Sequence, residues 1–535
     1  MQIILLSGGV SSGKSTLSDS LHQQFALAVL KTKDVIRDLA RRKMGKELES
    51  NRRAMQLFGE RLDRETKGRW VLTALTKLLR NAQGSIVVDA VRIREQIRAI
   101  RQSYGFSVVH IHLTAPKRVL AARYEGRGAT GFRELRSYAQ VEANPTEANV
   151  GQLEEMADVV IDTDLCRPED VLVRVASHLG LYSRDYSRLV DVLVGGQFGS
   201  EGKGHIASYL AREYAILVRV GGPNAGHKVF FTPEPYTHHQ LPSGTLRNPN
   251  ATLLISPGCV LDAQKLLREI AECRVGFERL VVDPQAMIIA PGDIRREAGL
   301  VRRIGSTGQG VGAAAARKIL DRGLAVALAK DVRQLKPFVR ETWRVLEGAY
   351  RDGKRVLVEG TQGAGLSLFH GNYPYVTSRD TSAAGCLSEA GIPASRLRRV
   401  VMVCRTQPIR VESPKGSSSG PMGKEIDWGV VSGRSKIAVE RLEEVEKTST
   451  THRQRRVAEF NWELLRRASA LNGPTDIALT FVDYQHPQNE KARRFEQLHA
   501  QTIMFIEEVQ RVAAAPVSLI STRFGFRSII DRRAW

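Results

Sequence analysis

Residues 189–204 read LVDVLVGGQFGSEGKG, a run of apolar residues followed at once by a glycine-rich loop. An apolar run of this length is typical of a buried strand, and the glycines let backbone N–H groups turn towards a phosphate. The residues after Gly204 have a helical pattern. This succession of strand, loop and helix predicts a nucleotide-binding α/β unit that begins near residue 187.

A second unit of the same kind opens the chain. Residues 2–6 read QIILL, a mostly apolar run typical of a strand, and residues 8–15 fit the phosphate-binding pattern GxxxxGK[ST]. In this pattern the backbone cradles phosphates, the lysine reaches the terminal phosphates and the hydroxyl ligates Mg²⁺. The predicted nucleotide-binding residues of this unit are Gly8, Gly13, Lys14, Ser15 and Thr16, with Ser15 also a metal ligand.

Buried-type strands are also expected at residues 85–89, 107–113 and 159–162, with helical stretches between them. Strands that alternate with helices predict a parallel sheet. We therefore predict an α/β fold with two P-loop-type parallel-sheet domains. Their predicted limits are residues 1–186 and residues 187–535.

The composition favours a multidomain globular protein that binds small anions. The chain has 535 residues, 42% hydrophobic and 25% charged, and a formal charge of +22. Basic and acidic residues alternate along the chain, which favours nucleotides over nucleic acid as partners. No apolar run is long enough to span a membrane. The five cysteines lack CxxC spacing, which argues against zinc and disulfides and favours the cytoplasm.

Segments of the N-terminal part resemble nucleoside-monophosphate and dephospho-coenzyme A kinases. These segments are residues 33–37, 89–92, 113–116 and 123–127. The resemblance implies a second, phosphotransferase activity whose acceptor is a nucleotide, a nucleoside or another small molecule. It further implies that Asp34, Arg37 and Arg92 face the acceptor and that Arg123 and Arg127 neutralise the transferring group.

Six more motifs follow the second glycine loop in a fixed order, at residues 220–227, 239–244, 305–312, 358–363, 370–378 and 450–456. Together with the loop they resemble adenylosuccinate synthetase over about residues 188–530. The resemblance implies a ligase that phosphorylates O6 of a purine nucleoside monophosphate and then joins L-aspartate to C6. It also implies Mg²⁺, ATP or GTP, and a homodimer.

The resemblance assigns roles position by position. Lys203 would sit on the transferring phosphates and His227 would act as an acid, and Ser200 and Gln362 occupy the other catalytic positions. The implied nucleotide-binding residues are Gly199, Glu201, Gly202, Gly204, Asn224, Thr307, Thr377 and Asp483. The implied aspartate-binding residues are Thr450, Thr451, Arg453 and Arg455, and the implied Mg²⁺ ligands are Ser200 and the Gly226 carbonyl.

Ser200 departs from the family pattern. Synthetases that act on inosine monophosphate (IMP) carry aspartate at this position, where the carboxylate takes the N1 proton. A serine hydroxyl is not a base at neutral pH without a partner, so either catalysis is lost or the substrate has changed. The chain resembles the branch that forms 2-aminoadenylosuccinate from dGMP, which carries serine here. Three hypotheses stay open: a ligase for (d)GMP, a ligase for IMP, and a non-catalytic nucleotide sensor.

Two more departures concern the phosphate donor and the dimer. Residues 480–483 read TFVD where GTP-using members have TKLD, and residues 521–525 read STRFG in place of STGP. ATP or dATP therefore stays open as donor, with Phe481 beside the base and Asp483 a base-site candidate. Asp321 stands where the family supplies an arginine across the dimer. Arg317 and Arg322 are alternatives for it.

Overall fold

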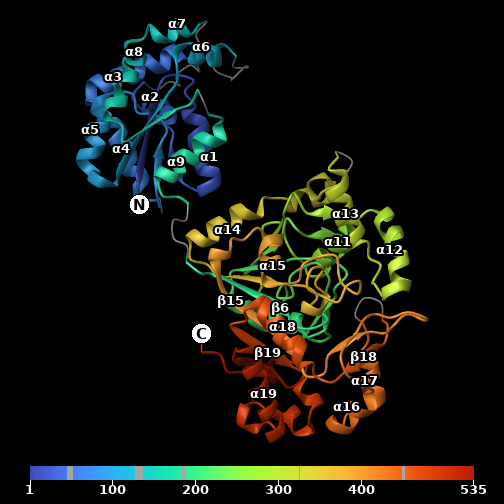
Figure 1. The fold of residues 1–535 in the computed structure, drawn as a ribbon. Coiled ribbons are helices and arrows are strands. Elements are labelled where there is room, and N and C mark those ends of the chain that lie inside the picture. The colour runs from blue at the N-terminus through green and yellow to red at the C-terminus, as the bar shows by residue number, and fades with distance from the viewer. Residues whose placement is uncertain are drawn as a thin grey trace. The chain divides into compact units, whose positions relative to one another are not determined.

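The computed structural model describes residues 1–44, 52–82, 84–126, 137–164, 166–182, 187–323, 326–448 and 452–534. The chain divides into two compact units, Met1–Tyr182 and Ser183–Trp535 (Figure 1). The domain limit predicted between residues 186 and 187 adjoins residues 183–186, which lie outside the described residues, and it stays a prediction.

The described residues of the first unit form a five-stranded parallel sheet. Its strand order is β2 (Ala28–Leu30), β3 (Ile86–Val88), β1 (Ile3–Gly8), β4 (Val108–Thr114) and β5 (Val159–Asp162). The predicted parallel sheet is confirmed. The strands predicted at 2–6, 85–89, 107–113 and 159–162 are confirmed as well, with ends that differ by at most two residues. Strand β2 was not predicted.

Helices cover both faces of this sheet. On one face, α1 (Lys14–Phe25) and α9 (Pro168–His178) bury leucines and valines against the strands. On the other, α4 (Arg69–Leu79) and α5 (Arg94–Tyr104) bury Trp70 and Ile97. The remaining α-helices of this unit's described residues are α2 (Thr32–Met44), α3 (Arg52–Thr66), α6 (Lys117–Glu125), α7 (Tyr138–Glu142) and α8 (Pro145–Asn149).

The described part of the second unit contains a nine-stranded sheet in which all neighbours are parallel except the last pair. Its order is β12 (Leu280–Val282), β10 (Thr252–Ile255), β7 (Ile216–Arg219), β14 (Val356–Glu359), β6 (Val190–Gly195), β15 (Leu397–Arg405), β19 (Asp476–Thr480), β20 (Val517–Ser521) and β21 (Ile529–Asp531). The central strand β6 is buried on both faces, as its mostly apolar sequence predicts, and its one charged residue, Asp191, pairs with Arg398.

Small two- and three-stranded sheets flank this core. They pair β8 (His227–Val229) with β9 (Tyr236–His238), β11 (Val260–Leu261) with β13 (Met287–Ile288), and β16 (Ile409–Val411) and β17 (Glu425–Ile426) with β18 (Arg455–Ala458). The α-helices are α10 (Lys203–Leu210), α11 (Ala263–Glu272), α12 (Pro291–Ile304), α13 (Val311–Asp321), α14 (Thr342–Arg351), α15 (Ala383–Ala390), α16 (Trp428–Ser435), α17 (Val439–Val445), α18 (Trp462–Asn472) and α19 (Ala500–Ala513).

The topology of the second unit gathers distant loops at one edge. Strands β6, β7, β14, β15 and β19 are parallel neighbours, so their carboxyl ends lie along the same edge of the sheet. The glycine loop after β6 therefore meets the segments that follow the other four strands. Among the described residues, no helix has the length and apolar character needed to cross a bilayer.

Candidate active site

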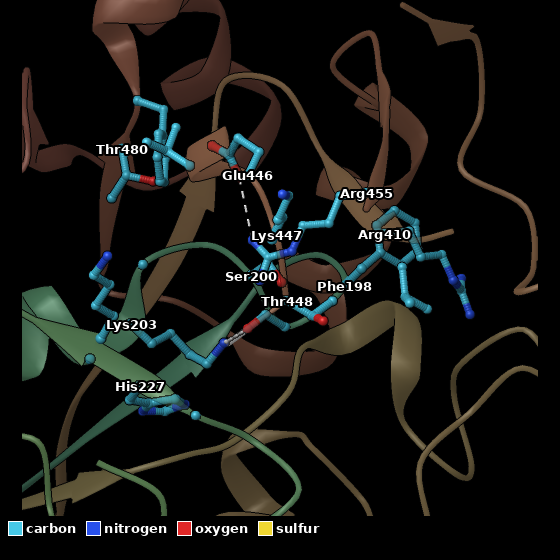
Figure 2. Close-up of a pocket in the computed structure, with 18 of the residues that line it drawn as sticks. Phe198, Ser200, Lys203, His227, Arg410, Glu446, Lys447, Thr448, Arg455 and Thr480 are labelled. Carbon is cyan, nitrogen blue, oxygen red and sulfur yellow. Dashed lines mark hydrogen bonds and ion pairs between the residues drawn. The ribbon is translucent and has the colours of Figure 1, made fainter. Parts of the chain in front are cut away.

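The loops at this edge line a cavity of about 790 Å³ in the second unit. Figure 2 shows side chains from the glycine loop, β8, β16, β18 and β19 around it. The structure brings most of the predicted ligase residues to this wall: Gly199, Ser200, Gly202, Lys203, Gly204, Asn224, Gly226, His227, Thr307, Gln362, Thr377, Arg455 and Asp483. Arg453 and Glu201 do not line it, and Thr450 and Thr451 lie outside the described residues.

Glu201 shapes the glycine loop from inside. Its carboxylate accepts hydrogen bonds from the backbone N–H groups of Gln197 at 3.0 Å and Gly199 at 2.8 Å. It also pairs with Lys203 Nζ at 2.6 Å, and both side chains are buried. The prediction that Glu201 binds nucleotide directly does not match this placement, because its oxygens are turned towards the loop. Lys203 is thereby held at the cavity wall.

His227 belongs to a buried polar network. Its Nδ1 lies against the Glu359 carboxylate at the end of β14, and Arg219 at the end of β7 pairs with that carboxylate at 2.8 Å. The Ser243 backbone N–H donates to the other Glu359 oxygen at 2.7 Å. An Nδ1–H donated to Glu359 leaves Nε2 as the free ring nitrogen. This buried Nε2 has no partner among the described residues, and His227 lines the cavity.

The network sets the ionisation of His227. Burial, then the charge of Arg219, lowers the pKa of His227 to about 4, so its imidazole is neutral at pH 7 in the ligand-free protein. Burial opposes ionisation of Glu359, but Arg219 and His227 hold the Glu359 pKa at about 2. A negative charge that develops beside Nε2 raises the proton affinity of the ring. His227 is therefore suited to respond to an anionic group in the cavity.

The loop after β14 supports the part of the wall next to the glycine loop. Gln362 has a left-handed backbone with φ 59°, and its Nε2 donates to Asn224 Oδ1 at 3.1 Å. The Thr361 hydroxyl donates to Gln362 Oε1 at 2.7 Å. This pairing orients two amide side chains that both line the cavity together with Thr307 and Thr377. Amides held in this way present fixed donors and acceptors to a purine or a phosphate.

The acidic residue Glu446 lines the cavity but is a poor substitute for the absent aspartate at position 200. Its oxygens accept from Arg405 Nη2 at 2.8 Å and Arg455 Nη1 at 3.3 Å. Burial opposes ionisation of Glu446, yet Arg405 and Arg455 lower its pKa. A carboxylate with a lowered pKa is a weak base. Ser200 itself offers a hydroxyl, and its carbonyl accepts from Arg405 at 3.3 Å.

Asp483 marks the far end of the cavity. The residue is half-buried, but its Oδ1 is buried without a partner among the described residues, and loss of solvation raises the Asp483 pKa to about 7. A buried carboxylate normally has hydrogen-bond donors, so a ligand with N–H groups fits here. Phe481 and Phe524 line the same cavity and offer aromatic faces to a base.

We expect Asp483→Asn to stabilise the second unit at high pH relative to wild type. The raised pKa means that folded Asp483 holds a proton between about pH 4 and 7 that the unfolded chain has lost, so the wild type loses stability as pH rises through this range. Asparagine removes that dependence. Thermal unfolding at pH 5 and pH 8 measures it, and an equal difference between the two proteins at both pH values would contradict it.

The first unit carries the second phosphate loop. Lys14 Nζ donates to the carbonyl oxygens of Gly8 at 2.7 Å and Gly9 at 2.8 Å, while Ser15 and Thr16 are exposed. Gly13 has φ 96°, and a Cβ there would meet nothing within 4 Å, so conformation rather than space favours glycine.

The predicted acceptor-site residues of this unit are already paired. Asp34 and Arg37 form an ion pair at 3.5 Å. Arg92 pairs with Glu147. Arg123 donates to the Thr163 hydroxyl at 2.9 Å and to the Thr163 carbonyl at 2.7 Å, and Arg127 lies outside the described residues. A phosphate acceptor would therefore compete with Glu147 for Arg92.

The two alternatives for a cross-subunit arginine differ. Arg317 binds Asp293 at 2.7 and 3.0 Å and the Ile288 carbonyl at 3.1 Å, so it is engaged within its own subunit. Arg322 is exposed, and its Nε donates to the Ile319 carbonyl at 3.0 Å. Of the two, only Arg322 is exposed.

Comparisons with known proteins agree with this division. The adenylosuccinate synthetase family model matches residues 192–333 and 327–489, and an AAA-domain model matches residues 3–160. The adenylosuccinate synthetase of Thermococcus sibiricus is 36% identical over 351 residues, which cover 64% of this chain and 98% of the relative. That of Methanocaldococcus jannaschii is 36% identical, with 64% and 96% covered.

Two solved structures resemble the second unit. The fully ligated adenylosuccinate synthetase of Plasmodium falciparum has a TM-score of 0.55 and 21% identity, and covers 65% of this chain and all of its own. The succinoaminodeoxyadenylate synthetase of cyanophage S-2L, bound to dGMP and to dATP as an energy donor, has a TM-score of 0.55 and 27% identity. It covers 65% of this chain and 96% of its own.

Proposed function

The chain belongs to the adenylosuccinate synthetase family and carries an additional N-terminal P-loop domain. From this premise we propose that the second unit joins L-aspartate to C6 of GMP or dGMP and forms a 2-aminoadenylosuccinate-type product. The energy comes from a nucleoside triphosphate through a 6-phosphoryl intermediate.

The observation that carries the proposal is Ser200 at the cavity wall. Its short, neutral side chain leaves space for a guanine 2-amino group, where an aspartate would add bulk and charge. The cyanophage protein that resembles this chain binds dGMP, which supports the same acceptor class. The archaeal relatives are named adenylosuccinate synthetases, and this favours IMP as the alternative acceptor.

The residues at the wall suit the two chemical steps. In the first, the bond between the γ-phosphorus and the β-phosphate oxygen of the donor breaks, the γ-phosphoryl group bonds to O6, and the N1 proton of the purine is lost to solvent. Lys203 neutralises charge on the transferring group. In the second, the aspartate amine forms a bond to C6, loses a proton and displaces phosphate. His227, whose Nε2 takes up a proton when the anionic ligands bind, serves as the acid that stabilises charge on the leaving oxygen. Arg455, which lines the cavity, binds an aspartate carboxylate.

The same arrangement argues against a sensor that binds nucleotide without turnover. Lys203 is fixed by Glu201, and His227 is fixed by Glu359. Binding alone does not require a lysine and a histidine that are each oriented by a buried carboxylate, whereas proton and phosphoryl transfer do.

Mg²⁺ fits this site as a partner of the nucleotide. Mg²⁺ prefers oxygen ligands and is commonly held by few protein groups plus phosphates. Among the described residues, no group of three or more His, Cys, Asp or Glu side chains is placed to hold a metal. The Ser200 hydroxyl and the Gly226 carbonyl would therefore hold the ion together with phosphate oxygens. Bound there, Mg²⁺ would neutralise phosphate charge.

Isotope transfer tests the 6-phosphoryl route. The protein is incubated with 6-¹⁸O-labelled dGMP, Mg²⁺, aspartate, and ATP with GTP, and the released phosphate is analysed by mass spectrometry. We expect the ¹⁸O atom to appear in phosphate, because C6 loses its oxygen to the phosphoryl group. Succinylated product with unlabelled phosphate would exclude the route.

We also propose that the first unit is a phosphotransferase that uses Lys14 on the terminal phosphates. We expect Lys14→Met to reduce ATP binding by this unit at least about tenfold, because one charged contact to phosphate is lost. Ligase activity should stay within about twofold. Lys43→Met, which removes an exposed lysine paired with Glu65 at 2.5 Å, serves as the matched control. Unchanged ATP binding by Lys14→Met would contradict the assignment.

A further inference from the structure

Arg405 is a buried cation that touches the active-site cavity only through other residues. It ends strand β15, its side chain is 1% exposed, and it does not line the cavity. Gln197 fixes its backbone, since Gln197 Oε1 accepts from Arg405 N–H at 3.1 Å and Gln197 Nε2 donates to its carbonyl at 3.0 Å. Arg405 is thus tied to the glycine loop on its backbone side.

The guanidinium of Arg405 joins three walls of the cavity. Nη1 donates to the Ser200 carbonyl at 3.3 Å, and Nη2 donates to Glu446 at 2.8 Å. The flat face of the group lies over the Phe481 ring, with its central carbon 3.8 Å from the ring centroid. A planar fork that binds at its edge and stacks on its face explains arginine here, since lysine offers neither.

Glu446 extends this link to the segment that carries the predicted aspartate-binding residues. Besides Arg405 it accepts from Arg455 Nη1 at 3.3 Å and from the Tyr484 hydroxyl at 2.8 Å. Figure 2 shows Glu446 facing Arg455 across the cavity wall, with Lys447 and Thr448 beside them. Glu446 therefore holds Arg455, the last of the predicted aspartate-binding residues, in place.

The Phe481 side of the link is equally fixed. The Thr406 hydroxyl, next along the chain from Arg405, donates to the Phe481 carbonyl at 2.6 Å. Phe481 also has a left-handed backbone with φ 59° and lines the cavity. A ligand that contacts the Phe481 ring thus meets a residue whose other contacts lead to Arg405.

We propose that Arg405 is a positioning residue that couples the donor-nucleotide site at Phe481 to the aspartate site at Arg455. This inference rests on the proposed function, which assigns aspartate to Arg455, and on the aromatic face that Phe481 offers to a donor base at the cavity wall. A donor base that holds the Phe481 ring restricts Arg405, and Arg405 then holds Glu446 and Arg455 in the binding arrangement. The second ligand to bind loses less conformational freedom, so each ligand strengthens the binding of the other.

Equilibrium dialysis tests the coupling in the full chain. The dissociation constant of labelled aspartate is measured with Mg²⁺ and dGMP, with and without a non-hydrolysable ATP analogue, and again with IMP and a GTP analogue. We expect the analogue to tighten aspartate binding about tenfold in wild type. The measured ratio is the dissociation constant of aspartate without the analogue divided by the constant with it. In Arg405→Lys we expect this ratio to fall below about twofold, while the affinity for the analogue alone changes less than about threefold.

Two further variants separate coupling from general damage. Arg399→Lys alters another arginine of β15, one that pairs with Asp476 at 3.2 Å and does not line the cavity, and should keep the wild-type ratio. Glu446→Gln weakens the same link while residue 405 stays arginine, and the ratio should fall below about twofold here too. Thermal unfolding shows whether each variant is folded. If Arg405→Lys does not fold, the ratio measured with Glu446→Gln tests the coupling.

The outcomes distinguish this inference from the proposed function. A wild-type ratio retained in either Arg405→Lys or Glu446→Gln would overturn the coupling, as would a wild-type ratio near one. Adduct formation with IMP alone would remove the proposed acceptor yet leave the ratio measurable with IMP. No adduct and no aspartate binding in any wild-type mixture would remove the proposed function itself, and the coupling with it.

Discussion

Ser200→Asp is expected to raise kcat/KM for IMP by about 10² and to lower it for GMP and dGMP by a similar factor. The new carboxylate supplies a base for the N1 proton of IMP. It also fills the space that the guanine 2-amino group needs at the cavity wall, where Ser200 lies. Initial rates with each acceptor, at saturating aspartate and donor, measure both changes.

Ser200→Asn is the matched control, because it adds nearly the same bulk without a base. We expect it to lose activity with (d)GMP and to gain none with IMP. If asparagine and aspartate behave alike with IMP, the base argument is wrong. If Ser200→Asp retains full activity with (d)GMP, Ser200 does not determine the acceptor.

His227→Asn is expected to lower kcat by about 10²–10⁴, with KM for the nucleotide changed only a few-fold. Asparagine keeps a polar side chain in the wall but has no ring nitrogen that carries a proton to the reacting oxygen. Steady-state rates with the preferred acceptor measure the loss. His178→Asn makes the same chemical change at an exposed position of α9 and should leave the rate unaltered.

Glu359→Gln tests whether the buried network acts through His227. Glu359 favours the protonated ring, so its neutralisation lowers the His227 pKa further and leaves less of the protonated ring to act as the acid. We expect a smaller loss of about 10–100-fold, and the double variant should be no slower than His227→Asn alone. Losses that multiply in the double variant would mean that Glu359 acts independently of His227.

The sequence predicted the elements whose pattern is local. The apolar run and glycine loop of residues 189–204 correspond to β6, the loop and α10, and the strands at 107–113 and 159–162 correspond to β4 and β5. The small antiparallel sheet of β16, β17 and β18 was not predicted. Each of its strands contains a charged residue and none has three successive apolar residues, unlike residues 159–161, although β18 carries Arg455.

The order of motifs predicted most of the cavity wall, but not the residues behind it. Glu359 and His227 are 132 positions apart, and Arg405 and Glu446 are 41 apart, so nothing local marks their pairing. The one available signal was a carboxylate at the end of a fully apolar strand, as in residues 356–359. The resemblance assigned Glu201 to the nucleotide, whereas here its carboxylate pairs with the loop's own N–H groups.

The acceptor is the central claim, and the mass of the product tests it most directly. Purified protein is incubated with Mg²⁺, L-aspartate, ATP and GTP, and with IMP, GMP or dGMP in separate reactions. The account predicts a succinyl adduct with GMP or dGMP and none with IMP. An adduct with IMP alone would contradict it and indicate ordinary adenylosuccinate synthesis, and no adduct in any reaction would contradict the ligase activity itself.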